Sequence, residues 1–186
     1  WKGLVGSEMC IRDRIKYDPL LAKQLLVEAG YSNSEDFPKL EILFNTNEDH
    51  RKIALAIQQM WQTTLGIEVE LVNQDWKVYL NREMIGDFQV SRAGWIGDYE
   101  DPNTFLDTLR PNRGNNKTGW ENKKYDDLLE LANSTNDTEK RYNLLMQAER
   151  ILIDEMPIVP LYTYVRSYQL SEDCLLYTSP SPRDPS

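Results

Sequence analysis

The sequence predicts an α/β fold in which helices flank a mixed sheet. Short apolar strands alternate along the chain with helical segments, a pattern typical of α/β proteins with a mixed or parallel sheet. Capping residues, prolines and glycines stand where those helices should begin and end. No internal repeat or low-complexity tract interrupts this order. The roughly 160 central residues suit one domain, or one lobe of a larger protein.

The first predicted helix begins at Asp18-Pro19. Asp18 has the side chain of an N-cap, and a proline is tolerated in the first helical turn. Apolar residues then recur at spacings of three and four until Gly30, which provides a left-handed stop. A half-buried strand is predicted next, over residues 39–45, because its apolar positions alternate.

Two further helix and strand pairs follow. A helix over 48–65 carries a regular apolar stripe and ends at Gly66, and residues 67–71 then alternate cleanly as a strand. A short helix over 75–85 begins with an aspartate cap, and a strand over 88–93 follows it. The chain therefore repeats the order strand, helix, strand, which implies a mixed or parallel sheet.

The last third of the chain is mostly helical. Asp101-Pro102 repeats the cap and proline signature, and Asn136 with Glu139 fits a capping box. A final strand contains Pro160, which favours an edge or an irregular position. The predicted elements are a helix over 103–109, a polar loop over 111–119, helices over 123–133 and 136–155, and a strand over 158–165.

The two ends of the chain encode complementary strands of one DNA segment. A DNA sequence that encodes residues 174–184 gives residues 4–13 when its reverse complement is read in a shifted frame. Folding does not select for such a relation, and the DNA resembles a sequencing-library transposon adapter. We therefore interpret 1–14 and 174–186 as translated adapter and expect both segments to be disordered. The natural part is then 15–173, and the sequence says nothing about a signal peptide or an anchor.

Composition excludes several classes of function. The formal net charge is -9, and removing the four basic and three acidic residues of the two ends leaves about -10. Because no basic stripe is present, nucleic acid and anionic membrane surfaces are poor partners. Both cysteines, Cys10 and Cys174, lie in the two ends, so the natural part has no disulfide or thiolate chemistry. The sequence also lacks a G-x-S-x-G nucleophile elbow and any cluster of histidines or cysteines that would predict a metal site.

The segment over 91–102 carries the side chains of a binding site. Arg92 and Asp98 offer opposite charges, which suit a ligand that carries both an amine and a carboxylate. Trp95 supplies a flat apolar wall with one N–H donor, and two glycines allow another backbone to approach closely. The segment leaves the end of a predicted strand, where ligands bind in α/β sheets. This combination indicates recognition rather than catalysis.

Other interpretations of these residues stay open on the sequence alone. Asp98 also suits a turn or an N-cap, and Arg92 suits a solvated strand face. His50, the one histidine, stands near a helix start, where surface and capping roles are common. The acidic residues around Asp98 suggest a pair of glycosidase carboxylates, although Asp101 already has a capping role.

Four runs of sequence resemble the oligopeptide-binding proteins, which are extracytoplasmic solute-binding proteins of family 5 and receptors of peptide ABC importers. The resemblance covers nearly all of residues 17–170 and keeps the order and spacing of the motifs. The runs are Phe44-Asn45-Thr46-Asn47 with His50-Arg51-Lys52, Leu71-Val72-Asn73-Gln74-Asp75-Trp76-Lys77, Arg92-Ala93-Gly94-Trp95 with Asp98-Tyr99, and Ile158-Val159-Pro160-Leu161-Tyr162.

The resemblance implies a role for each candidate residue. The residue matching Asp98 pairs with the α-amino group of a peptide, and those matching Arg92 and His50 help neutralise the C-terminal carboxylate of shorter peptides. The backbone around Gly94 and Ile96 bonds an extended peptide as an added strand. The positions that line side-chain pockets match Trp76, Trp95 and Tyr164.

The resemblance also implies the architecture and the partners. Residues 15–173 form the C-terminal part of one lobe of a two-lobed, periplasmic-binding-protein-like fold, with the last strand returning toward the other lobe. The parent protein is then a monomeric receptor for short peptides that works with the membrane permease of an ABC importer, without enzymatic activity or cofactor. It is periplasmic, or extracellular and lipid-anchored. Because such receptors close two lobes around the ligand, one lobe alone should bind peptides weakly or undetectably.

Three alternative functions remain. One is a dipeptide, nickel or haem-precursor binding protein of the same superfamily. The second is a hydrolase that uses carboxylates, and the third is a protein-interaction scaffold whose cleft near Trp95 holds another chain. The residues before the aspartate, Ile96-Gly97, also depart from those of many relatives.

Overall fold

The computed structural model describes residues 16–33, 36–111 and 113–164. The predicted adapter-derived ends lie outside the described residues, so their assignment stays a prediction. No helix in the described part of the chain is long and apolar enough to cross a membrane.

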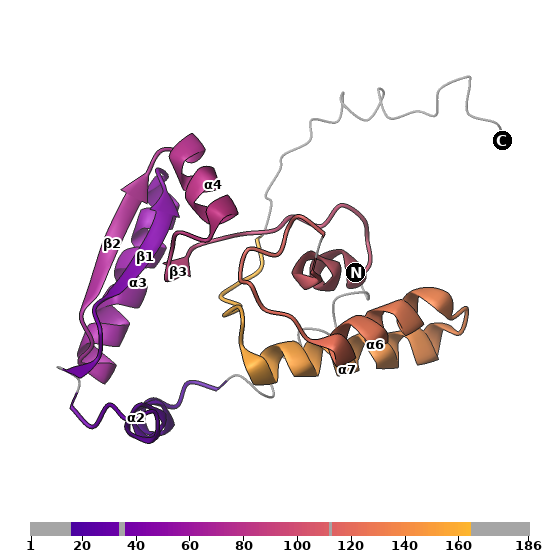
Figure 1. Ribbon diagram of the computed structural model, residues 1–186, viewed down its shortest axis with the longest axis horizontal. Coiled ribbons are helices and arrows are strands. Elements are labelled where there is room, and N and C mark those ends of the chain that lie inside the picture. The colour runs from indigo at the N-terminus through magenta and orange to yellow at the C-terminus, as the bar shows by residue number, and fades with distance from the viewer. Residues whose placement is uncertain (1–15, 34–35, 112, 165–186) are drawn as a thin grey trace, which may run out of the picture.

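The first half of the chain forms a small parallel sheet with helices on both faces (Figure 1). Strands β1 (Leu40–Asn45), β2 (Val69–Gln74) and β3 (Val90–Ser91) pair in parallel, in the order β2-β1-β3. Helix α3 (Glu48–Leu65) connects β1 to β2, and helix α4 (Trp76–Ile85) connects β2 to β3. Both connections are therefore βαβ crossovers, as parallel pairing requires.

Strand β1 is buried on both faces because it lies in the centre of the sheet. Ile42 and Phe44 pack toward α3, in a cluster that includes Ala54. Leu43 points to the opposite face and is fully buried. On that face Arg82 of α4 donates a hydrogen bond to Glu41, 2.7 Å away. The sequence predicted a half-buried strand here, and that prediction is wrong because the alternation rule describes a sheet with one solvated face.

Helix α2 (Pro19–Glu28) packs loosely against helix α3. Leu26 contacts the cluster under α3, but Leu21 and Leu25 are about half exposed. The helix begins at the predicted cap, since the Asp18 side chain accepts a hydrogen bond from the Leu21 amide. Its predicted apolar stripe is thus mostly uncovered by the described residues.

The second half of the chain is helical. The elements are α5 (Asn103–Leu106), the 3₁₀ helix η2 (Asp107–Leu109), α6 (Lys123–Ser134) and α7 (Thr138–Glu155). Helices α6 and α7 lie side by side, and both contribute to one apolar cluster (Figure 1). Tyr125 and Leu129 are fully buried there, and the Tyr125 hydroxyl donates a hydrogen bond to the Leu106 carbonyl at 2.7 Å.

Three predictions about elements need correction. The α/β class is confirmed, but the sheet formed by the described strands is parallel rather than mixed. The predicted strand over 158–165 is irregular over residues 158–164, and residue 165 lies outside the described part. Because no described strand pairs with this segment, nothing supplies the hydrogen bonds of a ladder. Helix α7 is capped by Asp137, whose side chain accepts from the Lys140 amide, and not by Asn136.

The sheet and the helical half have separate apolar cores. The cluster beneath α3 and the cluster between α6 and α7 share no residue among those described. The chain passes from one to the other through residues 92–102 (Figure 1). This passage contains the predicted binding residues, so the arrangement of both cores positions the candidate site.

Candidate ligand-binding site

The candidate site lies where the three parallel strands end. Ligands in α/β folds bind beyond the carboxyl ends of the strands. Strand β1 ends at Asn45, and His50 follows in the first turn of α3. Strand β3 ends at Ser91, and Arg92 follows it directly. Parallel pairing of β1 and β3 therefore brings His50 and Arg92 together, although they are 42 positions apart.

The backbone of Arg92 is held by the sheet. Its amide donates a hydrogen bond to the Leu43 carbonyl at 2.8 Å, which extends the pairing of β3 with β1. Its carbonyl accepts one from the Tyr79 hydroxyl of α4 at 2.9 Å. Tyr79 is 3% exposed, and its burial raises the pKa of the phenol, so the hydroxyl remains a donor.

The Arg92 guanidinium contacts aromatic and polar side chains from distant parts of the chain. It lies 3.4 Å from His50 Nδ1, and it donates hydrogen bonds to the hydroxyls of Tyr162, at 3.3 Å, and Tyr164. Its Cζ atom is 5.8 Å from the centre of the Tyr164 ring. The structure thus brings together three of the predicted residues, Arg92, His50 and Tyr164, and adds Tyr162.

The contact of Tyr162 with Arg92 was not predicted from the sequence. The two tyrosine rings meet edge to face, with centroids 5.0 Å apart. Their spacing of two residues in an extended segment puts both side chains on one side of the backbone. That alternation was the available signal, although it does not identify the arginine as the partner.

His50 is held in its neutral form. Burial lowers the pKa of the imidazole, and the positive charge of Arg92 lowers it further. His50 Nδ1 lies 2.7 Å from Asn45 Oδ1, a shorter contact than the one with Arg92. The shorter contact assigns the proton to Nδ1, which donates to Asn45 and leaves Nε2 as an acceptor.

Asp98 is exposed, and its carboxylate makes no hydrogen bond or ion pair with any residue that the structure describes. Its backbone amide donates to Thr104 Oγ1 at 3.0 Å, which fixes the main chain and leaves the side chain unused. The alternative that Asp98 caps its own turn therefore finds no supporting hydrogen bond. The nearby Asp101 is bound instead, in a two-pronged ion pair with Arg141 at 2.6 and 2.9 Å.

The main chain between Arg92 and Asp98 is open. Residues 93–97 make no backbone hydrogen bond with other described residues. At Gly94 a Cβ atom would lie 3.4 Å from the Tyr164 ring, so a side chain at this position would be in contact with the ring. Trp95 and Ile96 are 39% and 65% exposed. An extended backbone with free donors and acceptors thus runs from the cation to the anion.

Trp76 stands at the first position of α4. Its ring stacks on Tyr79, with centroids 5.6 Å apart and planes inclined by 21°. Because the Tyr79 hydroxyl binds the Arg92 carbonyl, the indole lies close to the carboxyl end of β3. The indole is 57% exposed, so a large apolar face remains available for contact.

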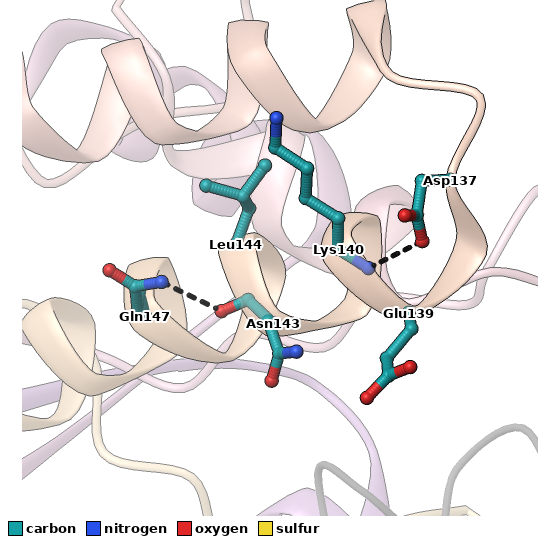
Figure 2. A pocket seen from close by; sticks show the side chains of 6 residues that line it. All are labelled: Asp137, Glu139, Lys140, Asn143, Leu144 and Gln147. Carbon is teal, nitrogen blue, oxygen red and sulfur yellow. Dashed lines mark hydrogen bonds between the residues drawn. The ribbon is translucent and has the colours of Figure 1, made fainter.

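The clearest surface hollows lie elsewhere. Figure 2 shows the larger one, along the first turns of α7, where the Asp137 cap and Lys140 form part of the lining. A second hollow lies between α2 and the end of α3. Neither is lined by a predicted site residue. No group of three or more acidic, histidine or cysteine side chains in the described ranges could hold a metal ion.

Comparison with known proteins identifies several relatives. The chain is 44% identical to the oligopeptide-binding protein OppA of Bacillus subtilis (strain 168), over 80% of this chain and 27% of that protein. It is 39% identical to the periplasmic murein peptide-binding protein MppA of Escherichia coli (strain K12), over 88% of this chain and 30% of that one. The chain therefore spans less than a third of the length of these relatives.

Solved structures match the fold as well. The Escherichia coli murein tripeptide binding protein MppA matches with a TM-score of 0.75 and 41% identity, over 78% of this chain and 28% of that one. Haemophilus influenzae OppA, in a complex with RPPGFSPFR, matches with a TM-score of 0.75 and 37% identity, over 78% and 29% of the two chains. The family model for bacterial extracellular solute-binding proteins, family 5 middle, matches residues 7–117. Because this match covers more than half of the 186 residues, the chain belongs to the bacterial extracellular solute-binding proteins of family 5.

Proposed function

We propose that this chain is part of a peptide-binding receptor of an ABC importer, and that it binds both termini of a short peptide through charge pairs. One observation carries the proposal. The half-buried cation of Arg92 stands at one end of a backbone segment, and the unpaired carboxylate of Asp98 stands at the other. The main-chain donors and acceptors between them make no hydrogen bond with any residue that the structure describes. A peptide zwitterion has the complementary charges and the complementary backbone.

Asp98 binds the α-ammonium group of the peptide. An ionised carboxylate accepts strong charge-assisted hydrogen bonds, and no described residue competes for this one. The carboxylate is exposed in this chain, so most of the bond strength depends on further protein that covers the site. Exclusion of water raises the contribution of a charge pair from the level of a surface pair toward that of a buried one.

Arg92 and His50 bind the peptide carboxylate. A guanidinium has five N–H donors, and the contacts with Tyr162 and Tyr164 leave donors for a further acceptor. The sheet and Tyr79 fix the arginine backbone, so the cation is positioned before the ligand arrives. The neutral imidazole supplies no second cation, and its Nδ1 proton is directed to Asn45, so it contributes only when it takes up a proton, which the negative charge of the bound carboxylate favours.

Main-chain bonds and aromatic walls complete the site. Residues around Gly94 and Ile96 pair with the peptide as an added strand, which provides affinity without regard to side chains. Trp76, Trp95 and Tyr164 contact the peptide side chains, because each ring is between 39% and 57% exposed. This combination favours binding many different peptides.

The parent protein, on this proposal, acts without catalysis. It is a monomer that delivers short peptides to a membrane permease from a periplasmic or lipid-anchored extracellular position. The names of the relatives support peptides as the ligand class. The hydrolase alternative requires two free carboxylates, and the second of them, Asp101, is committed to Arg141.

A chimera tests the proposal, since the chain spans about 27% of the Bacillus subtilis relative. Residues 16–164 replace the matching segment of that protein, and calorimetry measures the affinity for trialanine and for N-acetyl-trialanine. Asp98→Ala should weaken binding of trialanine by about 2–5 kcal/mol, the cost of removing one partner of a desolvated charge pair. Glu100→Gln is the matched control, because Glu100 is exposed and close by in the loop. Equal affinity of Asp98→Ala and the unchanged chimera for trialanine would remove Asp98 from the site.

The 186-residue chain alone should bind tripeptides weakly or undetectably. The chain spans less than a third of the length of its relatives, and the side chains of Asp98 and Trp76 are exposed. Calorimetry with trialanine checks this expectation. Micromolar affinity for the isolated chain would show that the rest of the receptor contributes little to binding.

A further inference from the structure

An ion pair joins the loop that carries Asp98 to helix α7. Arg141 of α7 donates to both carboxylate oxygens of Asp101, at 2.6 and 2.9 Å. Both side chains are only about a fifth exposed. Burial alone would raise the pKa of Asp101, but Arg141 and the Asn103 amide hold it below its usual value. A bidentate pair of this kind fixes orientation as well as distance.

Hydrogen bonds connect this ion pair to Asp98 step by step. Asp101 Oδ1 accepts from the Asn103 amide at 2.8 Å, and the Asp101 carbonyl accepts from the Thr104 amide at 3.1 Å. Thr104 Oγ1 then accepts from the Asp98 amide at 3.0 Å. Asn103 and Thr104 are both buried. The backbone of Asp98 is therefore fixed through Thr104 and Asp101 to Arg141.

Arg141 stands on α7, a helix that contributes to the helical core. It lies in the first turns of α7, close in sequence to the buried residues Leu144 and Leu145. Arg92, at the other end of the open backbone, is held by the sheet through Leu43 and Tyr79. The two predicted anchor charges thus depend on two different cores, and Arg141 fixes only the acidic one.

We propose that Arg141 is a positioning residue whose ion pair with Asp101 sets the place of Asp98 and thereby the preference of the receptor for a free amino terminus. This inference rests on the proposed function, because it assumes that Asp98 meets the ammonium group. Arg141 does not touch the ligand. Loss of its pair releases the loop over 98–104 and moves the carboxylate away from the amine, while the contacts to the peptide carboxylate and backbone persist.

The ratio of two affinities distinguishes this role from simple stabilisation. In the chimera described above, calorimetry gives the preference for trialanine over N-acetyl-trialanine. Arg141→Met should reduce that preference by roughly tenfold, with the affinity for the acetylated peptide changed by less than about twofold. Arg141→Lys keeps the charge but not the paired geometry, so its preference should be intermediate. Arg150→Met, an exposed arginine on the same helix, is the control and should match the unchanged chimera.

Two outcomes would overturn the inference. An unchanged preference would show that the ion pair does not place Asp98. A parallel loss of affinity for both peptides would show that Arg141 only stabilises the fold. A separate result identifies failure of the proposed function itself, because Asp98→Asn would then leave the preference for the free amine unchanged as well.

Hydrogen exchange on the 186-residue chain provides a second measurement that does not depend on binding. Arg141→Met should speed exchange of the Asp98 and Asn103 amides, which lose their fixed acceptors, and leave the amides of β1 unaffected. Equal protection of both loop amides in the variant and the original chain would contradict the proposed positioning. Faster exchange throughout α7 would indicate a purely structural role.

Discussion

Replacing Leu129 with alanine should loosen the helical half of the chain without loosening the sheet. Leu129 is fully buried between α6 and α7, in a cluster with Tyr125 and Leu145. The cluster that holds the sheet contains none of these residues. If each cluster stabilises its own half, a cavity in one should affect mainly that half.

The size of the effect follows from the buried volume. Leucine to alanine removes three carbon atoms, about 2.4 kcal/mol of transfer free energy at about 0.8 kcal/mol for each. The cavity left behind adds to this, which gives about 2–5 kcal/mol in total. Leu131, on the same helix, is 46% exposed, so Leu131→Ala should change the free energy of unfolding by less than about 0.5 kcal/mol and serves as the matched control.

Hydrogen exchange followed by mass spectrometry of peptide fragments measures each half separately. Amides of α6 and α7 should exchange about 30- to 4,000-fold faster in Leu129→Ala, because each 1.4 kcal/mol corresponds to a tenfold change. Amides of β1 and β2 should exchange at their original rates. Equal acceleration in the sheet would show that the two cores unfold as one unit, and the reasoning from separate clusters would then be wrong.

Two further predictions concern ionisable groups. The pKa of Asp101 is lowered on folding, so its pair with Arg141 stabilises the chain above the unfolded value of 3.8, and this stabilisation is lost as pH falls through the folded value. Urea denaturation gives the free energy of unfolding at pH 6 and at pH 3, and the difference between the two should be smaller in Asp101→Asn than in the original chain. Equal differences in the two proteins would refute this prediction. The pKa of His50 is lowered on folding, so the free energy of unfolding should rise with pH between the folded pKa and 6.5. An NMR titration of this single histidine should give a pKa below 6.5, and that pKa should increase in Arg92→Gln. The same pKa in both proteins would exclude Arg92 as a cause of the shift.

Helix boundaries could be predicted from the sequence because they depend on local chemistry. Asp18 and Asp75 accept hydrogen bonds from amides two or three residues away, and Gly66 adopts the left-handed conformation that ends α3. Such contacts need no knowledge of the rest of the fold. Helix α7 is an exception, because Asn136 and Asp137 are both suitable caps and the helix begins after the second of them.

Burial and long-range pairs could not be predicted in the same way. Leu43 is buried because α4 covers the second face of β1, which depends on how two crossovers pack. Asp101 has the pattern of a local cap, and its Oδ1 does accept from the Asn103 amide. Its stronger contact, with Arg141, joins residues 40 positions apart. A sequence pattern shows that a carboxylate needs partners but not which distant cation supplies them.

The candidate binding residues were predicted from side-chain chemistry and from the family resemblance. The structure shows which contacts hold each of them in place. Arg92, His50 and Tyr164 meet because parallel pairing and the segment after α7 converge on one point. Asp98 stands apart from them, with its carboxylate unpaired among the described residues. The sequence alone treated Arg92 and Asp98 as members of one motif, because they are only six positions apart.

Close spacing in the sequence does not make the two charges one rigid unit. Arg92 is tied to β1 and α4, whereas Asp98 is tied to α7 through Asp101. Between them the backbone of residues 93–97 has no hydrogen bonds to other described residues that would fix its length. The distance between the charges is therefore set by how the helical core sits against the sheet. The segment after α7 brings Tyr162 to the guanidinium and so links the helical core back to the sheet-held cation. Contacts between the cores, and not the motif itself, must then decide how long a zwitterion both charges can reach.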